Sequence, residues 1–545
     1  MFSRISRLTR REFLVYGPLS IAGLIGAVSG IKHYLSPSSL QKFKGSIVGA
    51  NAKVGHLMRT GKFPAVVTTS SVETVIVGGG VAGLSSAWWL QKHGHQDFLL
   101  LELDTQVGGN SQSGSNEVSR YPWGAHYLPL PGPEAVYVKA LLEELKVIKG
   151  DHNGSPVYDE YYLCADPGER LYFQGRWHEG LIPQTGIPPA DEIQHQEFLG
   201  LMKEYSHRRG GDGKFLFTIP VDRSSQDEEF TRLDKISMTQ FLDSRGWTAP
   251  TLRWYVDYCC KDDYGQAAKD VSAWAGIHYF ASRSGKADNA GKESVLTWPE
   301  GNGWLVKKLE EKFPEKIKKS SLAFNIQKNP DGGLFVDTYD VTGKTSSRIL
   351  AKNVIYAAPR FTAKYSVHPT LGKLTQPQTS STPWLVANVT VTHRPEGRGH
   401  ELAWDNVSYY SPSLGYIVAT HQALSHLKKE TVLTYYLPLT DEAPAVARVK
   451  AFQRDHSYWS NLVAADLEKM HPGITQTITA IDAWVWGHGM VGPGVGYLWG
   501  ENRKEMQQSL GDLHFAHTEM SGISIFEEAQ YRGVMAAKKV LERRG

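Results

Sequence analysis

The stretch VETVIVGGGVAGLSSAWWLQKHGHQDFLLLELD, residues 72–104, decides the fold of this chain. It begins with a short run of mainly β-branched residues, Thr74–Val77, which is typical of a strand. The Gly-rich turn Gly78–Gly83 and an amphipathic helical pattern follow, and a second strand, Phe98–Leu101, leads into Glu102. Strand, GxGxxG turn, helix and acid, in this order, form the fingerprint of a dinucleotide-binding α/β domain.

Each part of this fingerprint has a physical task. Gly78 makes the tight turn, Gly80 lets the backbone approach a pyrophosphate, and Gly83 lets helix and strand pack closely. The N-terminus of the helix points its N–H groups at the phosphates, and Glu102 accepts hydrogen bonds from ribose hydroxyls. Its spacing from Gly83 is close to the roughly 20 residues of the motif. We therefore assign the nucleotide to Gly78, Gly80, Val81, Ala82, Gly83, Glu102 and Leu103; a glycine-rich turn without a ligand is the alternative.

The residues after Glu102 distinguish FAD from a nicotinamide cofactor. Gly108 and Gly109 follow the acid closely and precede Asn110. This Gly-Gly pair resembles the second flavin signature of the glutathione-reductase-like and amine-oxidase-like families. There the chain passes over the pyrophosphate and runs on toward the isoalloxazine ring. The resemblance implies FAD as the cofactor, held in part by Gly108, Gly109 and Asn110.

Three later stretches resemble the flavin-containing amine oxidoreductase superfamily, which includes monoamine and polyamine oxidases and carotenoid-type desaturases. Trp298–Trp304 is similar to the family's Pro-x-Gly-Gly turn. The strands that contain Ala323 and Ala358 are similar to its returning nucleotide segment, and the stretch that ends in Glu519 is similar to its closing Ala-Gly-x-Glu motif. The resemblance implies that Ala323 and Ala358 contact the nucleotide and that Glu519 lines the pyrophosphate and ribityl chain.

The closing helix is predicted partly from its own residues. Ser524 and Glu527 have the spacing of a capping box, with Ser at the N-cap and Glu at N3 of a helix that ends in Lys and Arg. Such an N-terminus offers unpaired N–H groups and a partial positive charge. Placed at the flavin pyrimidine edge, as the resemblance implies, it brings Ile525 and Phe526 to the cofactor and stabilises the anionic reduced flavin. An ordinary capped terminal helix is the alternative.

The sequence signals for substrate binding are less specific than those for the cofactor. Trp123–Tyr127 resembles the amine oxidase stretch that runs past the reactive face of the flavin, so Ala125 is expected at the cofactor and His126 and Tyr127 at the substrate. A buried structural His–Tyr pair is the alternative. Trp486 is the third catalytic candidate, because it belongs to a cluster that either binds an amine by cation–π contact or forms an aromatic core edge. The cluster comprises Trp484, Trp486, His488, Tyr497 and Trp499.

Three acids and two departures from the family pattern bear on the reaction. Asp262, Asp263 and Asp405 either anchor a distal ammonium group or are solvated surface acids. Many family members carry a lysine, bonded through water to flavin N5, on a strand where this chain has Ala387 and Asn388. Ile525 replaces the aromatic residue of the closing motif. Both departures weaken O2-dependent amine oxidation and fit either a dehydrogenase that passes electrons to another acceptor or an enzyme with a different substrate.

The first residues resemble an export signal. Thr9–Leu14 is similar to the bacterial twin-arginine motif, and the moderately apolar run Phe13–Ile31 follows it. The resemblance implies that the twin-arginine machinery exports the folded chain to the periplasm or the outer face of the cytoplasmic membrane. Ala27–Ser29 is a weak cleavage site, and the run is close to the roughly 20 residues that span a bilayer, so membrane anchoring by an uncleaved N-terminus stays open.

Composition limits which classes of protein, binding partner and metal site remain to be considered. A chain of 545 residues with 41% hydrophobic and 21% charged residues is typical of a soluble protein with two domains or lobes. The net charge of +3, without an extended basic block beyond the first residues, argues against a nucleic-acid partner. Cys164, Cys259 and Cys260 have no metal-ligand spacing, so no metal site is expected. A disulfide between the adjacent Cys259 and Cys260 is the alternative to two buried thiols.

The predicted fold class is α/β, with a Rossmann-like FAD-binding domain interleaved with an α+β substrate domain built on an antiparallel sheet. The expected segments are a signal or anchor (1–35), a linker (36–71), FAD-binding parts (72–150, 296–365 and 501–545) and substrate-domain parts (151–295 and 366–500). The alternation of residues 383–393, 416–422, 431–439 and 480–488 predicts the strands of that sheet.

The leading hypothesis is an exported FAD-dependent oxidoreductase of amine oxidase type. It would transfer a hydride from an amine C–H, in a polyamine or similar cation, to flavin N5, with O2 or another redox partner as the electron acceptor. One alternative is an FAD-dependent desaturase or isomerase that acts on an apolar lipid or isoprenoid. Another is a flavoprotein redox partner without turnover. A polar aromatic pocket with carboxylates favours the amine, whereas a pocket lined by Leu, Ile, Phe and Met favours the lipid.

Overall fold

The computed structural model describes residues 41–183, 185–423 and 429–542. The twin-arginine motif and the apolar run that follows it lie outside the described residues, so export and anchoring remain predictions. Within the described part of the chain, no helix is both long enough and apolar enough to cross a membrane.

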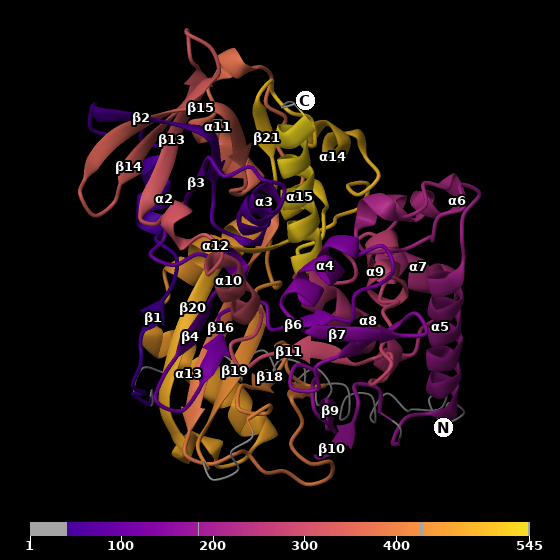
Figure 1. The fold of residues 1–545 in the computed structure, drawn as a ribbon. Helices are drawn as coiled ribbons and strands as arrows, with labels where there is room; N and C mark the ends of the chain where they lie inside the picture. The colour runs from indigo at the N-terminus through magenta and orange to yellow at the C-terminus, as the bar shows by residue number, and fades with distance from the viewer. Residues whose placement is uncertain (1–40, 184, 424–428, 543–545) are drawn as a thin grey trace, which may run out of the picture.

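The first sheet carries the nucleotide fingerprint (Figure 1). Its strands are β2 (Val66–Val77), β3 (Phe98–Leu101), β12 (Ile317–Lys318), β13 (Ser321–Lys328), β14 (Leu334–Asp340), β15 (Thr345–Tyr356) and β21 (Leu513–Phe515). They are arranged in the order β12-β3-β2-β15-β14-β13, and β21 also pairs with β15. The pairs β12–β3, β3–β2, β2–β15 and β15–β21 are parallel, whereas β13, β14 and β15 form an antiparallel meander. This Rossmann-like sheet confirms the predicted α/β class.

Strand β2 begins earlier than the sequence predicted, at Val66 instead of Thr74. Its first half also pairs with β15, with Ser71 opposite Leu350. The chain before it folds as β1 (Ile47–Val48) and α2 (Ala52–Leu57). In its described part, the stretch expected to be a linker over 36–71 therefore contains β1, α2 and the start of β2. The Ser- and Thr-rich composition that suggested a linker is compatible with an exposed strand.

Two helices from distant parts of the chain pack together beside this sheet. Helix α3 (Val81–Lys92) follows β2, and α15 (Phe526–Glu542) is the last described helix. Gly533 of α15 lies so close to α3 that a Cβ there would be 2.1 Å from the carbonyl oxygen of Ala82. Only glycine permits this approach, so Gly533 sets the distance between the two helices. Their contact joins the early and late parts of the nucleotide domain.

A second, eight-stranded sheet forms the other lobe (Figure 1). Its order is β1, β20 (Ile478–Val491), β16 (Ser381–Val391), β19 (Thr431–Pro438), β18 (Tyr416–Val418), β17 (Asp405–Ser408), β9 (Glu169–Phe173) and β10 (Arg176–Glu179). All neighbours are antiparallel except β1–β20 and β17–β9. The strands expected at residues 383–393, 416–422, 431–439 and 480–488 correspond to β16, β18, β19 and β20. Strands β1, β9 and β10 come from earlier segments and extend the predicted sheet.

Helices surround the two sheets. They are α4 (Val136–Glu144), α5 (Pro189–His207), α6 (Glu228–Thr231), α7 (Met238–Ser244), α8 (Pro250–Tyr264), α9 (Ala273–Ala281), α10 (Gly303–Glu310), α11 (Ala363–Ser366), α12 (Pro444–Phe452), α13 (His456–Met470) and α14 (Glu501–Met506). Three two-stranded pairs complete the fold: β4 (Ser113–Ser115) with β5 (Arg120–Pro122), β6 (Tyr127–Pro129) with β11 (Val295–Thr297), and β7 (Ile148–His152) with β8 (Ser155–Tyr158). Apolar side chains of α5, α7, α8 and α9 share one buried cluster with β2, β15 and β21, so the lobes have a continuous core.

A buried ion cluster joins α15 to the helical lobe. Asp222 accepts hydrogen bonds from Arg503 at 2.9 Å and from Arg532 at 2.8 Å. Burial alone would raise the pKa of Asp222, but the two guanidinium groups outweigh burial and lower the pKa to about 2. Beside them, Glu528 accepts a hydrogen bond from the backbone N–H of Val221 at 2.6 Å. Glu528, which stands where the amine oxidase family has glycine, therefore joins α15 to the segment before Asp222.

Replacing this carboxylate should destabilise the fold. An Asp222→Asn variant is expected to lose about 3 kcal/mol of unfolding free energy, because it leaves two nearly buried arginines without their counter-charge. The pKa of Asp222 lies below its ordinary value of 3.8, so the stabilisation is complete above about pH 4 and disappears as the pH falls toward 2. Urea unfolding of both proteins at pH 7 and pH 3 measures the difference. The exposed pair of Asp243 and Arg253 supplies a control, since Asp243→Asn should change stability little.

Candidate active site

The glycine-rich turn has the geometry that a pyrophosphate site needs. Gly78 has φ of +105°, and a Cβ there would lie 2.8 Å from the backbone nitrogen of Ala358. A Cβ on Gly83 would lie 1.9 Å from the carbonyl oxygen of Gly78. In contrast, a Cβ on Gly80 would meet no atom within 4 Å. Side chains at Gly78 or Gly83 would clash with neighbouring backbone, whereas the space beside Gly80 is free. Helix α3 begins at this free position without a side-chain cap.

Glu102 is held in place at the end of β3. Its Oε2 accepts a hydrogen bond from the N–H of Gly79 and its Oε1 accepts one from the N–H of Asp104, both at 2.8 Å. Burial raises the pKa of Glu102 to about 7, although these N–H groups favour the ionised form. Additional donors, such as the hydroxyls of a ribose, would stabilise the carboxylate further.

The second glycine pair lies against the first turn. The N–H of Gly108 donates to the carbonyl oxygen of Gly79 at 2.8 Å, and Gly108 and Gly109 have φ of +123° and +54°. Asn110 follows, and its side-chain amide donates to the carbonyl oxygen of Gly489 on β20. The loop thus leads from the pyrophosphate turn to the interior cavity between the lobes, as the flavin signature implies.

This cavity is formed by segments that are distant in sequence. Residues predicted for the cofactor or substrate that line it are Asn110, Ala125, His126, Tyr127, Trp486, Ile525 and Phe526. Its other polar and aromatic walls include Tyr258, Asp262, Asp263, Arg283, Asn302, Trp384, Asp405, Tyr436 and Glu527. Ile219, Val386, Leu414, Ile417 and Met490 contribute apolar surface.

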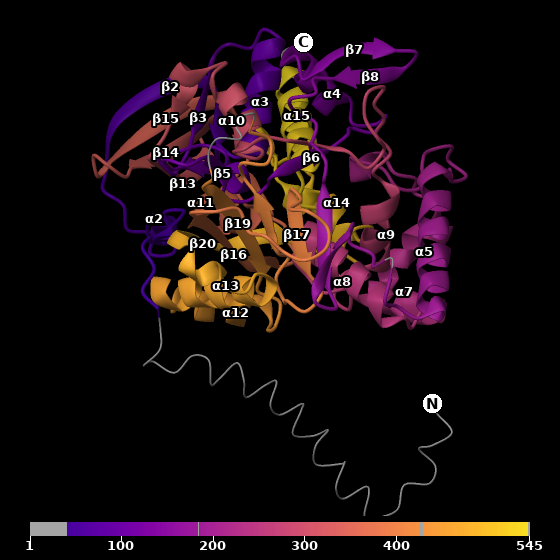
Figure 2. The same ribbon diagram turned by 90° about the horizontal axis from the view of Figure 1, so that it is seen from below.

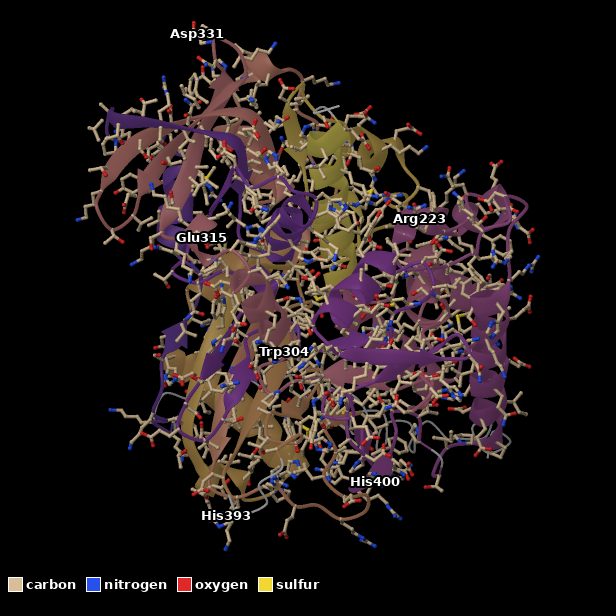
Figure 3. The ribbon with its side chains drawn as sticks, viewed as in Figure 1. Arg223, Trp304, Glu315, Asp331, His393 and His400 are labelled. Atoms are coloured by element: carbon tan, nitrogen blue, oxygen red, sulfur yellow. The ribbon has the colours of Figure 1, made fainter. Side chains whose placement is uncertain are left out.

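The stretch from Ala125 to Tyr127 is fixed by the turn before α10. The N–H of Asn302 donates to the Ala125 carbonyl oxygen at 3.0 Å, and the Asn302 side-chain amide donates to the Tyr127 carbonyl oxygen at 3.0 Å. The hydroxyl of Thr297 donates to the His126 carbonyl oxygen at 2.9 Å. Trp304, labelled in Figure 3, is in the first turn of α10 and stacks on Trp298 with ring centroids 5.0 Å apart.

His126 is surrounded by aromatic rings. Its ring centroid lies 4.7 Å from that of Tyr436 and 5.5 Å from that of Trp404. Burial lowers the pKa of His126 to about 4, against the opposing effect of the Gly124 carbonyl, so the imidazole is neutral at physiological pH. The His126 imidazole therefore adds no positive charge to the cavity at that pH.

Trp486 is the member of the predicted aromatic cluster that lines this cavity. Its indole N–H donates to the Trp123 carbonyl oxygen at 2.6 Å, and its ring stacks on Trp484 with centroids 4.3 Å apart. The others have separate surroundings: His488 packs on Phe361, the Tyr497 hydroxyl bonds to the Glu519 carbonyl, and Trp499 packs on Trp274. The five residues of the cluster therefore do not line the cavity together, and its aromatic walls are His126, Tyr127, Tyr258, Trp384, Tyr436 and Trp486.

The three aspartates are not solvated surface acids, because all of them line the cavity. Asp263 accepts a hydrogen bond from Arg283 at 2.7 Å, and the same guanidinium group donates to the Tyr127 hydroxyl at 3.1 Å. The Tyr127 hydroxyl also donates to Asp262 at 3.3 Å. Burial, reinforced by the charge of Asp263, raises the pKa of Asp262 to about 7. Burial and neighbouring acids raise the pKa of Asp405 well above its usual range.

The N-terminus of α15 forms another wall. The helix begins at Phe526, and the N–H of Ala529 donates to the carbonyl oxygen of Ile525 at 3.1 Å. The helix thus starts one residue later than the capping box predicted, and the Ser524 hydroxyl accepts a hydrogen bond from the N–H of Val491 at 2.9 Å. Burial raises the pKa of Glu527, which lines the cavity, to about 7.

The remaining predicted residues lie outside the cavity wall. Val81 and Ala82 form the buried first turn of α3, and Leu103 follows Glu102. Ala323 is on β13, and Ala358 follows β15. Glu519 is buried, and its carboxylate accepts a hydrogen bond from the backbone N–H of Arg360 and lies 3.0 Å from His517. Glu519 thus joins the ends of β15 and β21, and its contact with a cofactor remains a prediction.

Sequence reasoning missed two charged groups of the cavity. Arg283 lies just after α9 in a polar stretch that looks like an ordinary surface loop. Glu527 was considered only as a helix cap. No signal in the local sequence marked them, because the ion pair of Arg283 with Asp263 depends on tertiary packing. Among the described residues, no group of three or more His, Cys, Asp or Glu side chains has a metal-binding arrangement.

The residues around the cavity fit a flavin. Asn302 Oδ1 and Trp384 Nε1 are buried without a hydrogen-bond partner in the described part of the chain, and both residues line the cavity. Buried polar atoms of this kind are normally satisfied, so they indicate a polar ligand. The open face of Gly80 and the carboxylate of Glu102 fit the pyrophosphate and ribose of the same molecule.

Comparison with known proteins agrees with this geometry. Residues 76–145 match the family model of an NAD(P)-binding Rossmann-like domain. No curated protein sequence matches the chain significantly.

Solved structures with the same fold include amine oxidases. Wild-type putrescine oxidase bound to putrescine has a TM-score of 0.64 and 15% identity, with 87% of this chain and 100% of that chain covered. Cyclohexylamine oxidase from Brevibacterium oxydans IH-35A has a TM-score of 0.61 and 14% identity, with 87% and 99% covered. A CLA-producing fatty acid isomerase from P. acnes has a TM-score of 0.58 and 16% identity, with 86% and 98% covered. The chain therefore has the fold that these two amine oxidases share with the fatty acid isomerase.

Proposed function

We propose that this protein is an FAD-dependent oxidoreductase of amine oxidase type that acts on a cationic amine, such as a diamine or polyamine. The observation that carries the proposal is the charge of the cavity. Asp262, Asp263, Asp405 and Glu527 line it, and Arg283 is the one Lys or Arg among its described lining residues. Arg283 pairs with Asp263, so the other carboxyls lack a cationic partner there. A cationic substrate supplies that charge, and the aromatic walls favour it through cation–π contact.

FAD, when bound, supplies the acceptor for a hydride from the carbon next to the amine nitrogen. The chain's residues bind and orient the amine: Asp262 and Asp405 hold ammonium groups, and His126, Tyr436 and Trp486 enclose the alkyl chain and exclude water. The nitrogen must lose a proton before its lone pair can assist hydride loss. Glu527 has a pKa near 7, which suits it to accept that proton at physiological pH. The resulting imine hydrolyses.

The electron acceptor is either O2 or another redox partner. Where many amine oxidases have a lysine, the side chain of Asn388 donates to the Pro122 carbonyl at 3.2 Å and accepts from the Thr434 hydroxyl at 2.7 Å. Both polar atoms of Asn388 are thus engaged within the protein, which supports an acceptor other than O2. The twin-arginine signal supports export of the folded holoprotein to the periplasm or the outer face of the cytoplasmic membrane.

The fold similarity to a fatty acid isomerase makes lipid chemistry the second candidate. The apolar part of the cavity, which includes Leu414, Ile417 and Met490, would suit such a substrate. An acyl chain beside Asp262 and Asp405 would supply no positive charge to these carboxyls, and the cost of burying acids without a cation favours the amine.

Anaerobic mixing of the purified holoprotein with putrescine, spermidine, a fatty acid and an isoprenoid tests the proposal. Bleaching of the flavin absorbance by an amine is expected, and its recovery with and without O2 identifies the type of acceptor. If only the fatty acid or the isoprenoid bleaches the flavin, the lipid hypothesis replaces the amine hypothesis. A yellow protein that no substrate bleaches would be a redox partner without turnover.

A further inference from the structure

Helix α12 has the reverse of the usual arrangement of a surface helix. Its small residues Ala447 and Ala451 are buried, whereas its larger apolar residues Val446, Val449 and Phe452 are 46%, 59% and 51% exposed. A surface helix of a globular protein normally turns its larger apolar side chains to the core and polar ones to water. The exposed residues are spaced by three, so they lie on one side of the helix. We call Val446, Val449 and Phe452 the apolar face of α12.

The described chain begins on the helix next to α12. The N–H of Gln41 donates to Oδ1 of Asn461 on α13 at 3.1 Å, and the side-chain amide of Asn461 donates to the Gln41 carbonyl at 2.9 Å. Helices α12 and α13 both pack on β20, and Ala451 and Trp459 belong to one buried cluster (Figure 2). Gln41 therefore lies at the side of the molecule that carries α12 and α13.

The segment before Gln41 limits where a membrane could lie. Nine residues, 32–40, separate the end of the moderately apolar run Phe13–Ile31 from Gln41. The ten residue steps from Ile31 to Gln41 reach at most about 36 Å when extended. If the run is inserted in a bilayer, the bilayer surface lies within that distance of α13, on the same side of the molecule as the apolar face.

Charges at this side suit an anionic surface. Basic side chains at the C-terminal part of α12 and just after Gln41 are Lys42, Lys44, Lys450 and Arg454, and acidic ones near the helix ends are Asp441, Glu442 and Asp455. Glu442 binds Lys450, and Asp455 caps α13 by accepting from the N–H of Tyr458 at 2.8 Å. Lys42, Lys44 and Arg454 remain to attract phosphate groups. Apolar side chains flanked by lysine and arginine are the pattern of helices that lie in a membrane interface.

We propose that the apolar face of α12 is a membrane-docking surface. Val446, Val449 and Phe452 enter the headgroup region of a bilayer that contains anionic lipid, and α12 lies along the bilayer surface. The inference is independent of the proposed amine chemistry, because it uses the exposure of α12, the position of Gln41, the surrounding charges and the apolar run Phe13–Ile31.

A local probe in the full-length holoprotein tests this surface. A Val449→Cys variant is labelled with an environment-sensitive fluorophore and mixed with vesicles of phosphatidylcholine and phosphatidylglycerol. We expect a blue shift and severalfold brighter emission, quenched by brominated acyl chains. Ile193→Cys on α5 is the matched control, because Ile193 is also apolar and 55% exposed, and its emission should not change. Labelled wild-type protein corrects for Cys164.

Vesicle flotation of the same samples shows whether the protein is bound to the vesicles. This separate measurement is needed because residues 1–40 could bind the membrane without any contact by α12. If the protein floats while the label at position 449 stays in water, the proposal is wrong. It is also wrong if the emission rises with protein concentration in the absence of vesicles, because a second copy then covers the face. In a Val446→Ser/Phe452→Ser background, the shift at position 449 should be largely lost, and unchanged insertion would contradict the role of these side chains.

Discussion

A Glu102→Ala variant is expected to purify almost colourless, with FAD affinity weakened about 100-fold. The carboxylate is positioned by the N–H groups of Gly79 and Asp104, and in the proposed complex it accepts hydrogen bonds from the ribose hydroxyls. Two hydrogen bonds to a charged group, at about 1.5 kcal/mol each, correspond to roughly a 100-fold change in affinity. The ratio of flavin to protein absorbance after purification, followed by titration of the stripped protein with FAD, measures the loss.

Glu73→Ala supplies the control for this experiment. Glu73 is on the same strand as the fingerprint, β2, but forms a surface ion pair with Lys352 at 2.7 Å. Its loss should leave the yellow colour unchanged. A fully yellow Glu102→Ala protein would contradict the proposed binding of the ribose by Glu102. A wild-type protein that takes up no FAD would contradict the proposed function as a whole.

The second large effect is expected at Asp262. Its pKa is raised from 3.8 to about 7, so the carboxyl is neutral below that pH and ionised above it. A cationic amine binds the ionised form, so kcat/KM for putrescine should rise as the pH increases through about 7. Replacing Asp262 by asparagine should lower kcat/KM about 10- to 100-fold at pH 8, the effect of losing a charged hydrogen bond of about 1.5–3 kcal/mol. The difference should shrink at pH 6, where the wild-type carboxyl is protonated.

Asp257→Asn is the matched control on the same helix, α8. Asp257 accepts a hydrogen bond from the N–H of Ala268 at 2.8 Å and does not line the cavity, so its replacement should leave amine kinetics nearly unchanged. Glu527 titrates in the same range, and the comparison is therefore made between variant and wild type at each pH. Equal kcat/KM for Asp262→Asn and wild type at pH 8 would show that the ammonium binds elsewhere.

The nucleotide domain was predictable because local sequence determines it. A strand, a glycine turn and a helix are contiguous in residues 74–92, and the close packing of Gly83 against the Gly78 carbonyl lies within that unit. The long β2 was less predictable, because its first half is exposed and stabilised by pairing with β15, far away in sequence. Strands β1, β9, β10 and β17 were missed for the same reason, since short strands depend on partners that local periodicity does not show.

The cavity could be predicted only where a motif marked its residues. His126 and Tyr127 followed from a contiguous stretch, and the structure brings both to the cavity. The burial of Asp262 and Asp405 could not be predicted, because one is on a helix and the other on a short strand, and only tertiary packing joins them. Arg283 was missed because its pairing with Asp263 spans a helix and a loop. Charge balance in a buried site depends on the whole fold and leaves little trace in local sequence.

The close contact of α3 and α15 has a consequence for folding. The helix of the nucleotide fingerprint packs on a helix that begins only at Phe526, and the same late segment supplies one wall of the cavity. Contacts between segments so distant in sequence form late, because the long loop between them has to close first. A folding intermediate that has the early strand–turn–helix unit but not the docked α15 would therefore lack a complete cavity.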